Sequence, residues 1–175
     1  MSEGKESPMR EIRLFKVVVN IGVGEAGERL QKAEQVLEMV TGHKPVRTIS
    51  KTTNRDLGIR AGMPIGCKVT LRGKDAEEFV KKALWIRENK VNDYSFDPEG
   101  NLSFGLNDYT DFPEMKYDPE IGIFGMDISV VLERPGFSVK RRRIARRRIP
   151  HHHRITKEEG IAFFKERFSA EVIEE

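Results

Sequence analysis

Three glycines near the start of the chain have the spacing of a nucleotide-binding motif. Gly22, Gly24 and Gly27 follow an apolar run and precede a helical pattern in the stretch KVVVNIGVGEAGERL, residues 16–30. Between a strand and a helix, G-x-G-x-x-G is a dinucleotide fingerprint, because the glycines let the backbone turn sharply and the helix N-terminus attracts pyrophosphate. A nicotinamide-dependent oxidoreductase is therefore one hypothesis for this chain.

The residues around these glycines are unfavourable for a dinucleotide. The second predicted strand, residues 46–50, has no Asp or Glu at its end to bind the ribose, although Arg47 could pair with the extra phosphate of a phosphorylated cofactor. Glu25 and Glu28 lie in the turn, where they would repel pyrophosphate. We therefore predict no cofactor and no small-molecule substrate. The glycines are better explained by a tight turn at which the backbone approaches a partner closely.

Other residues capable of chemistry lack the neighbours that a catalytic or metal site needs. Cys67 lies in an alternating strand pattern with no His or Asp near it in the sequence, which predicts a small buried hydrophobe rather than a nucleophile. The run 151–153 consists of three histidines, but no Cys or acidic residue stands at ligand spacing from them, and successive residues of one element point apart. We predict no metal site and no enzymatic activity.

Charge is strongly segregated along the chain, although the formal net charge is only +3. Residues 140–154, KRRRIARRRIPHHHR, contain eight Lys or Arg and no Asp or Glu, and are called the arginine segment below. Residues 93–127 contain nine Asp or Glu and one Lys, and are called the acidic segment. Because like charges packed this closely repel each other, the arginine segment needs an anionic partner.

Nucleic acid is the partner that the arginine segment favours. Seven of its eight basic residues are Arg, whose guanidinium group binds phosphate through two parallel hydrogen bonds. A membrane surface is a weaker alternative, because the segment has no face of aromatic and leucine side chains. No stretch of the chain approaches the roughly 20 apolar residues of a membrane span. A further alternative is that the acidic segment neutralises the arginine segment within the folded chain.

Hydrophobic periodicity predicts one α+β domain, residues 10–175, after a flexible N-terminus, residues 1–9. Two pairs, Asp75 with Glu78 and Thr156 with Glu159, predict capped helix starts. The element order predicts an antiparallel sheet with helices packed on one face, extended loops and a basic C-terminal segment. The predicted strands are 13–21, 46–50, 65–72 and 126–133 with a hairpin at 101–106, and the predicted helices are 28–41, 75–89 and 156–168.

A sheet with helices on one face leaves its other face open. The alternation of the predicted strands places small or donor-rich side chains on that face, namely Lys16, Asn20, Lys68, Thr70 and Arg72. Such side chains contact phosphate and ribose groups, and a protein that binds these groups recognises the shape of an RNA rather than its base sequence. The composition of the open face therefore predicts an RNA partner.

Four stretches of the sequence are distinctive: KVVVNIGVGEA, KPVRTISKTTNRDLGIRAGMPIGCKVTLRG, ERPGFSVKRRR and HRITKEEGIAFFKERF. Together they resemble the archaeal branch of the 5S-RNA-binding ribosomal protein family, the fifth protein of the large subunit. The resemblance extends over nearly the whole chain from about Pro8, and the part from Arg47 to Gly73 is long and specific. The last stretch is similar to the archaeal and eukaryotic members rather than the bacterial ones.

The resemblance implies a cytoplasmic structural constituent of the large ribosomal subunit that binds 5S rRNA and large-subunit rRNA at the central protuberance. It also implies contacts with the P-site tRNA, with a small-subunit protein across an intersubunit bridge and with other 5S-associated ribosomal proteins. Its first two motifs, together with the open face, give the predicted 5S rRNA-binding residues: Lys16, Asn20, Gly22, Gly24, Arg47, Thr48, Ser50, Lys51, Thr52, Thr53, Asn54, Lys68, Thr70 and Arg72.

The loop RDLGIRAGMPIG, residues 55–66, matches the loop through which the family contacts tRNA. Its glycines permit sharp bends, its arginines can pair with phosphate, and Met63 with Pro64 is expected to form an apolar tip. The alternative is a long hairpin loop that packs on its own sheet. The predicted tRNA-contact residues are Arg55, Gly58, Arg60, Gly62, Met63 and Pro64.

The arginine segment differs from the bacterial pattern of the family. We expect it to be flexible without RNA and to contact rRNA phosphates through Lys140, Arg141, Arg142, Arg143, Arg146, Arg147, Arg148 and Arg154. The acidic segment is expected to face away from RNA, toward a basic protein at the subunit bridge. A free RNA-binding protein or ribosome-assembly factor with the same sheet chemistry is the alternative to a ribosomal constituent.

Overall fold

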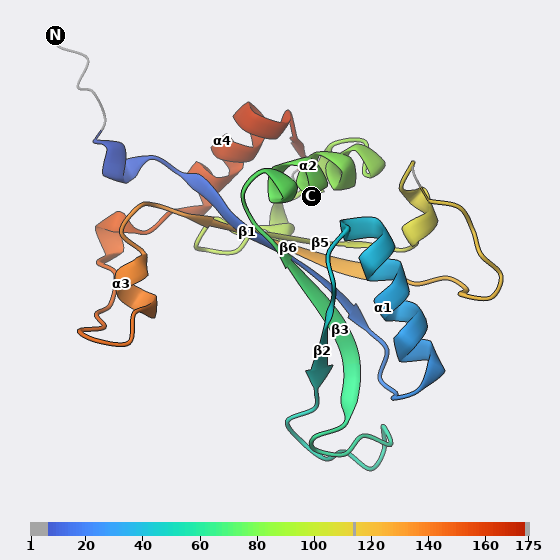
Figure 1. Cartoon of the computed structure of the whole chain (residues 1–175). Helices are drawn as coiled ribbons and strands as arrows, with labels where there is room; N and C mark the ends of the chain where they lie inside the picture. The colour runs from blue at the N-terminus through green and yellow to red at the C-terminus, as the bar shows by residue number, and fades with distance from the viewer. Residues whose placement is uncertain (1–6, 114, 174–175) are drawn as a thin grey trace, which may run out of the picture.

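The computed structural model describes residues 7–113 and 115–173 and is built around one twisted antiparallel sheet (Figure 1). Its five strands lie in the order β2-β3-β1-β6-β5. They are β1 (Arg13–Gly22), β2 (Val46–Ile49), β3 (Pro64–Leu71), β5 (Leu102–Leu106) and β6 (Met126–Glu133). The helices are α1 (Glu28–Thr41), α2 (Gly73–Ile86), the short α3 (Ser138–Arg141) and α4 (Lys157–Phe168).

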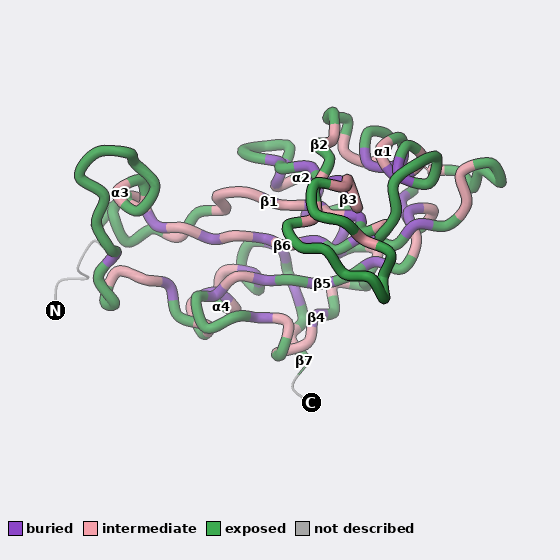
Figure 2. Tube along the Cα trace, turned by 90° about the horizontal axis from the view of Figure 1, so that it is seen from below, coloured by how far each residue is buried: buried purple, intermediate pink, exposed green. Residues whose placement is uncertain are grey.

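The sheet has one buried and one open face because its strands alternate between apolar and polar residues. In β1, Val17, Val19 and Ile21 are buried, while Lys16 and Asn20 are only half-buried. The strands β3, β5 and β6 show the same alternation. Figure 2 shows it for β6, where purple and pink alternate along the tube. The buried face packs against α1 and α2, as expected from the sequence.

The last helix is anchored by aromatic packing and by its cap. The Phe164 ring is buried and lies 5.7 Å, between centroids, from the rings of Phe96 and Phe168. At the helix start, the Thr156 hydroxyl accepts from the backbone of Glu159, and the Glu159 carboxylate accepts from the backbone of Thr156. The predicted capping box is therefore confirmed. It fixes the point at which the arginine segment re-enters the domain.

The second helix differs from its prediction. Helix α2 begins at Gly73 and ends at Ile86, so the predicted span 75–89 was wrong at both ends. The predicted capping pair, Asp75 and Glu78, lies inside the helix, and its N-cap residue makes no side-chain cap. The helix ends early because Glu88 and Asn89 adopt φ values of 55° and 58°. A right-handed helix cannot continue through residues with positive φ.

Three further elements depart from expectation or extend it. The predicted hairpin at 101–106 is the single strand β5, which pairs with β6. A second, parallel pair of strands, β4 (Lys90–Asn92) and β7 (Glu171–Ile173), was not predicted. Residues 1–6 of the predicted N-terminus lie outside the described residues, whereas Pro8–Arg10 form a short 3-10 turn before β1.

The single cysteine lies where the alternation places it, on the buried face of β3. Cys67 is completely buried, and burial, with a smaller effect of the Glu34 charge, raises the pKa of its thiol to about 11. The thiol therefore stays protonated and unreactive at neutral pH. We expect native protein at pH 8 to resist a thiol-labelling reagent and denatured protein to be labelled completely. Rapid labelling of the folded protein would contradict this burial.

Candidate nucleic-acid interface

The open face of the sheet carries mainly polar side chains, with the valines Val18, Val46 and Val131 among them. In one row across it, Asn20 of β1 pairs with Lys68 of β3 and with Asp127 of β6. In the next row, the hydroxyls of Ser103 and Ser129 lie 3.3 Å apart on the neighbouring strands β5 and β6. No described helix covers these positions, and the rows place hydroxyl, amide and ammonium groups side by side. This surface can bind ribose hydroxyls and phosphates.

Predicted residues of three strands meet on this face. Lys16, Asn20, Lys68 and Thr70 lie on it, and Thr48 of β2 joins it beside Gly66 and Gly22. Asp127 and Ser129 also lie on it but were missed. The alternation of residues 126–133 was a signal that could have found them, because it puts both side chains opposite the buried Ile128. Asp127 and Glu133 place negative charges on this face, and Glu133 is paired with Arg141.

Arg47 lies apart from the other residues of the predicted 5S rRNA-binding set. Its strand position pairs with the buried Cys67, so its side chain points toward α1. There its guanidinium group donates to both carboxylate oxygens of Glu34, at 2.5 and 3.0 Å. The hydrogen bond lowers the pKa of Glu34, which keeps the carboxylate charged. Arg47 thus fastens β2 to α1, and the structure does not bring it together with the open face.

The three glycines form a closed turn between β1 and α1. The backbone N–H groups of Val23 and Gly24 donate to the Ile65 carbonyl oxygen at 3.0 and 2.8 Å, which ties the turn to the start of β3. Gly24 and Gly27 have φ values of 81° and 131°, a region that other residues rarely adopt. The strand-to-helix turn predicted from the sequence is therefore confirmed. Gly22 itself is exposed at the rim of the open face.

The loop between β2 and β3, residues 50–63, is a hairpin held by its own hydrogen bonds. The Ser50 hydroxyl donates to the Thr52 carbonyl at 2.7 Å, and the Thr53 hydroxyl accepts from the Ala61 N–H at 3.0 Å. The Asn54 side chain accepts from the Asp56 N–H at 3.0 Å. These predicted RNA-binding side chains therefore also shape the loop. The loop cations are exposed, and no described carboxylate forms an ion pair with the side chains of Lys51, Arg55 and Arg60.

The predicted apolar tip of this loop was wrong. Met63 lies at the base of the loop, where its carbonyl accepts from the Ser50 N–H at 2.9 Å, and Pro64 is the first residue of β3. The exposed apolar residue at the far end is Leu57, 67% exposed, next to a turn at Gly58 with φ 66°. The sequence pattern was ambiguous because the loop contains two apolar stretches, and only pairing with β2 decides which one joins the sheet.

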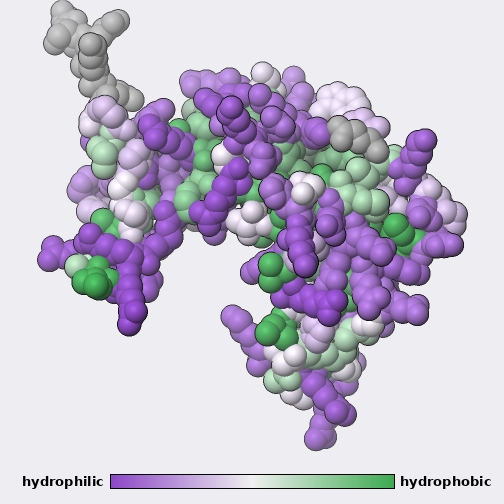
Figure 3. Space-filling model, in the orientation of Figure 1, coloured by the Kyte–Doolittle hydropathy of each residue, from purple (hydrophilic) through white to green (hydrophobic). Residues whose placement is uncertain are grey.

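In the structure the arginine segment consists of short helical turns joined by irregular chain, and its flexibility in the absence of RNA stays a prediction. It starts in α3, continues through a loop and a short 3-10 turn at His151–His153, and leads into α4. Buried Ile149 and Ile155 attach it to the domain, and the Arg147 N–H donates to the Val139 carbonyl at 3.3 Å. Figure 3 shows the end of the segment as mainly hydrophilic. Ile144 is an exposed apolar residue of the segment, with 82% of its surface accessible.

Most charges of the arginine segment are available to a partner. Arg141 binds both carboxylate oxygens of Glu133, at 2.5 and 2.8 Å, and Arg142 donates to the Ala145 carbonyl. Arg154 contacts Glu99 at 3.4 Å, which among the described residues is the one ion pair between the arginine and acidic segments. Neutralisation by the acidic segment is therefore slight. Within the described chain no carboxylate pairs with Lys140, Arg143, Arg146, Arg147 or Arg148.

An aromatic clamp connects the arginine segment to the sheet. Phe15 lies at a β-bulge in β1, and its ring centre is 4.0 Å from the Arg141 guanidinium and 4.8 Å from that of Arg72. The ammonium of Lys16 lies 5.8 Å from the same ring. Such cation–π contacts are attractive, and they leave Arg72 and Lys16 accessible on the outer side, whereas Arg141 is also bound by Glu133. The clamp, Phe15 with Arg72 and Arg141, aligns basic groups along the end of the open face.

Replacing Phe15 with Leu is expected to loosen the arginine segment locally. Leucine keeps most of the apolar volume but lacks the ring face that holds Arg141, a loss of about 0.5–1 kcal/mol per cation. Trypsin should then cut after Arg142 or Arg143 several-fold faster, because cleavage follows local opening. Tyr117→Leu removes an exposed ring elsewhere and is the control. Equal cleavage rates in both variants and the original protein would show that the clamp does not hold the segment.

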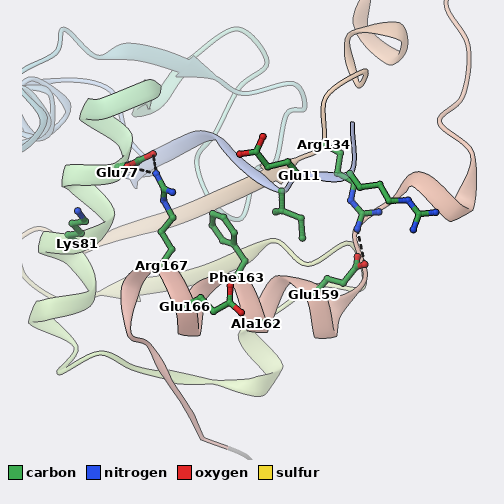
Figure 4. Close-up of a pocket in the computed structure, with 11 residues that line it drawn as sticks. Glu11, Glu77, Lys81, Arg134, Glu159, Ala162, Phe163, Glu166 and Arg167 are labelled. Atoms are coloured by element: carbon green, nitrogen blue, oxygen red, sulfur yellow. Dashed lines mark hydrogen bonds and ion pairs between the residues drawn. The ribbon is translucent and has the colours of Figure 1, made fainter. Parts of the chain in front are cut away.

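A large hollow lies on the helix-covered side, away from the predicted RNA residues. It measures about 820 Å³ and lies between the start of the chain, α2 and α4, with Phe163 at its floor (Figure 4). Two ion pairs cross it, Arg167 with Glu77 at 3.0 Å and Arg134 with Glu159 at 2.7 Å. None of the predicted site residues lines it. Its charges are of both signs and mainly join neighbouring elements, so it gives no reason to expect catalysis.

Models of known protein families match most of the chain. A model described as "Ribosomal protein L5" matches residues 7–60, and a model of the C-terminus of the same ribosomal family matches residues 64–163. The two matches adjoin at the loop between β2 and β3, and together they cover the five-stranded sheet, α1, α2, α3, the arginine segment and the first part of α4. No helix of the described ranges 7–113 and 115–173 has the length and apolar character to cross a membrane.

Relatives from archaea match almost end to end. A protein of Thermoplasma acidophilum is 54% identical over 95% of this chain and 99% of its own length, and one of Sulfurisphaera tokodaii is 55% identical over 96% of each. A Picrophilus torridus protein is 53% identical over 99% of both chains. All three are named "Large ribosomal subunit protein uL5". This chain therefore belongs to the ribosomal protein L5 family and is a structural protein of the large ribosomal subunit, not an enzyme.

Proposed function

We propose that this protein binds 5S rRNA in the large subunit through the open face of its sheet. The proposal is based on the row of side chains that contains Lys68 and Asn20. This row lies on the face of the sheet that no described helix covers, whereas α1 and α2 bury the other face. The rim adds Gly22 at one end, and Arg72 with Lys16 beside the Phe15 ring at the other. Small hydroxyl and amide side chains let an RNA backbone lie flat on the strands, and the cations at the rim pair with its phosphates.

The other contacts of the proposed function use the parts that project from the sheet. The loop 50–63 and the arginine segment both extend away from α2 and α4 (Figure 1). The loop, with Leu57, Arg55 and Arg60 exposed, is suited to the P-site tRNA, whereas the arginine segment is suited to large-subunit rRNA phosphates. The acidic segment exposes Tyr117 and Ile123 among carboxylates, a surface that fits a basic small-subunit protein at the bridge.

Binding to isolated 5S rRNA at several salt concentrations tests the proposal. With six or more phosphate contacts, the association constant should fall by about a thousandfold or more between 50 and 200 mM salt. A transcript of equal length and unrelated fold is the control and should bind at least about tenfold more weakly at 150 mM salt. Equal affinity for both RNAs, or a flat salt response, would refute specific binding through this surface.

A free RNA-binding or assembly factor would use the same surface, and sedimentation separates the two alternatives. A constituent should remain with large subunits through a high-salt sucrose gradient in near-stoichiometric amount. A factor should be present only on precursor particles and leave mature subunits. Crosslinking of ribosomes with peptide mapping then shows whether the loop 50–63 contacts tRNA and whether the acidic segment contacts a small-subunit protein.

A further inference from the structure

The free cations of the arginine segment are not spread evenly over its surface. Five basic side chains converge on one hollow of about 470 Å³ between α3 and the start of α4. Phe137 and Ile149 form its apolar wall, and Glu99 is its single acidic residue. The five are Lys140, Arg146, Arg147, Arg148 and Arg154. We call this hollow the arginine cradle.

The backbone holds the cradle open by turning back on itself. After α3, Ala145 takes up a positive φ of 52°, and the guanidinium of Arg142 donates to the Ala145 carbonyl at 2.9 and 2.7 Å. The Arg147 N–H donates to the Val139 carbonyl, which returns the chain to the side of α3. Buried Ile149 then fixes the far wall. The course of the backbone therefore brings these cations to one side of the segment.

The charge within the cradle is unbalanced. Glu99 reaches only Arg154, at 3.4 Å, and within the described chain the other four cations have no carboxylate partner. Like charges held this close raise each other's electrostatic energy, and a bound anion relieves the repulsion. Arg141 and Arg142, in contrast, are occupied by Glu133 and by a backbone carbonyl. The eight basic residues of the segment thus divide into structural and available groups.

We propose that the arginine cradle binds two closely spaced phosphate groups, as in a sharply turned stretch of RNA backbone. Its volume lies within the range of about 300–1,000 Å³ of small-ligand pockets, larger than one phosphate needs. The guanidinium groups that line the hollow match phosphate oxygens in pairs, and Phe137 offers an apolar surface to the ribose between two phosphates. That RNA supplies these phosphate groups rests on the proposed function. A free polyphosphate would offer the same pair of phosphate groups.

Paired glutamine variants separate a cradle from a diffuse charged surface. Arg147→Gln and Arg148→Gln each remove one cation of the cradle, whereas Arg143→Gln removes an exposed cation of the same segment outside it. At 150 mM salt, each cradle variant should weaken binding of 5S or large-subunit rRNA by about tenfold, whereas Arg143→Gln, which removes a single exposed phosphate contact, should weaken it by only about threefold. Circular dichroism and the melting temperature should be the same for all three variants.

Calorimetric titration of the RNA-free protein with inorganic pyrophosphate tests the cradle independently. Saturable 1:1 binding is expected, at least about tenfold tighter than for orthophosphate, lost in the cradle variants and kept in Arg143→Gln. If pyrophosphate competes with rRNA, the phosphate groups bound by the cradle belong to the RNA backbone. If pyrophosphate binds without competing, the ligand of the cradle is a free polyphosphate.

The failures of the two proposals look different. Equal losses of RNA affinity in Arg143→Gln and Arg147→Gln, with no pyrophosphate binding, would overturn the cradle and leave RNA binding by the protein intact. Pyrophosphate binding by a protein that shows no preference for rRNA would overturn the proposed function and support the cradle.

Discussion

Replacing Lys68 with Glu is expected to weaken 5S rRNA binding by about 10- to 100-fold at 150 mM salt. Lys68 is an exposed cation in the middle of the open face, beside Asn20 and two strands away from Asp127. The reversal removes one phosphate partner and adds a second negative charge to the row that already contains Asp127. The slope of log affinity against log salt should therefore fall by about one to two, because fewer counterions are released.

The matched control is Lys81→Glu. Lys81 lies on α2, on the helix-covered side of the sheet, and carries the same charge. Its reversal changes the net charge of the protein equally but places the new carboxylate away from the proposed interface, so affinity should fall by less than about threefold. If both variants lose affinity alike, net charge rather than the open face attracts the RNA. Thermal melts of both variants exclude unfolding as the cause.

The elements that form the core were predictable, because the periodicity of apolar residues and the residues that end a helix can be read from a short stretch of sequence. The strand β6 and the helix α1 have the predicted bounds, since each carries a complete apolar period and a clear end, such as the left-handed Gly42 after α1. The capping box of α4 was equally clear. The strands β4 and β7 were not predictable: each has three residues, and their pairing joins parts of the chain about 80 residues apart.

The candidate site was predictable where one strand pattern fixes which way a side chain points. Asn20, Lys68 and Thr70 follow from the alternation of two long strands. Arg47 does not, because β2 has only four residues, a register irregularity follows Thr48, and the deciding contact is with Glu34 of another element. The arginine segment shows the same limit. Its composition predicts a highly charged tail but does not reveal the contacts with distant Phe15 and Glu99.

Replacing either of two neighbouring glycines on adjacent strands with alanine should have different effects on the free energy of unfolding. Gly22 of β1 and Gly66 of β3 are register partners. A Cβ at Gly66 would lie 2.7 Å from the Ile21 carbonyl oxygen and 3.0 Å from the Thr48 hydroxyl, whereas a Cβ at Gly22 would have no atom within 4 Å. Gly66→Ala is therefore expected to cost about 1–3 kcal/mol of unfolding free energy in a urea titration, because backbone must move.

Gly22→Ala isolates the role of the glycine motif in binding. Alanine at this exposed strand end should leave the free energy of unfolding unchanged or raise it by a few tenths of a kcal/mol, since it restricts the unfolded chain without a clash. If the RNA backbone passes directly over Gly22, the added methyl group displaces it, and 5S rRNA affinity should fall by about tenfold in a protein of full stability. Unchanged affinity would mean that Gly22 only serves the turn into α1. A loss of affinity without a loss of stability can arise only from a partner in contact with that backbone, which makes this glycine a direct probe of where the RNA lies.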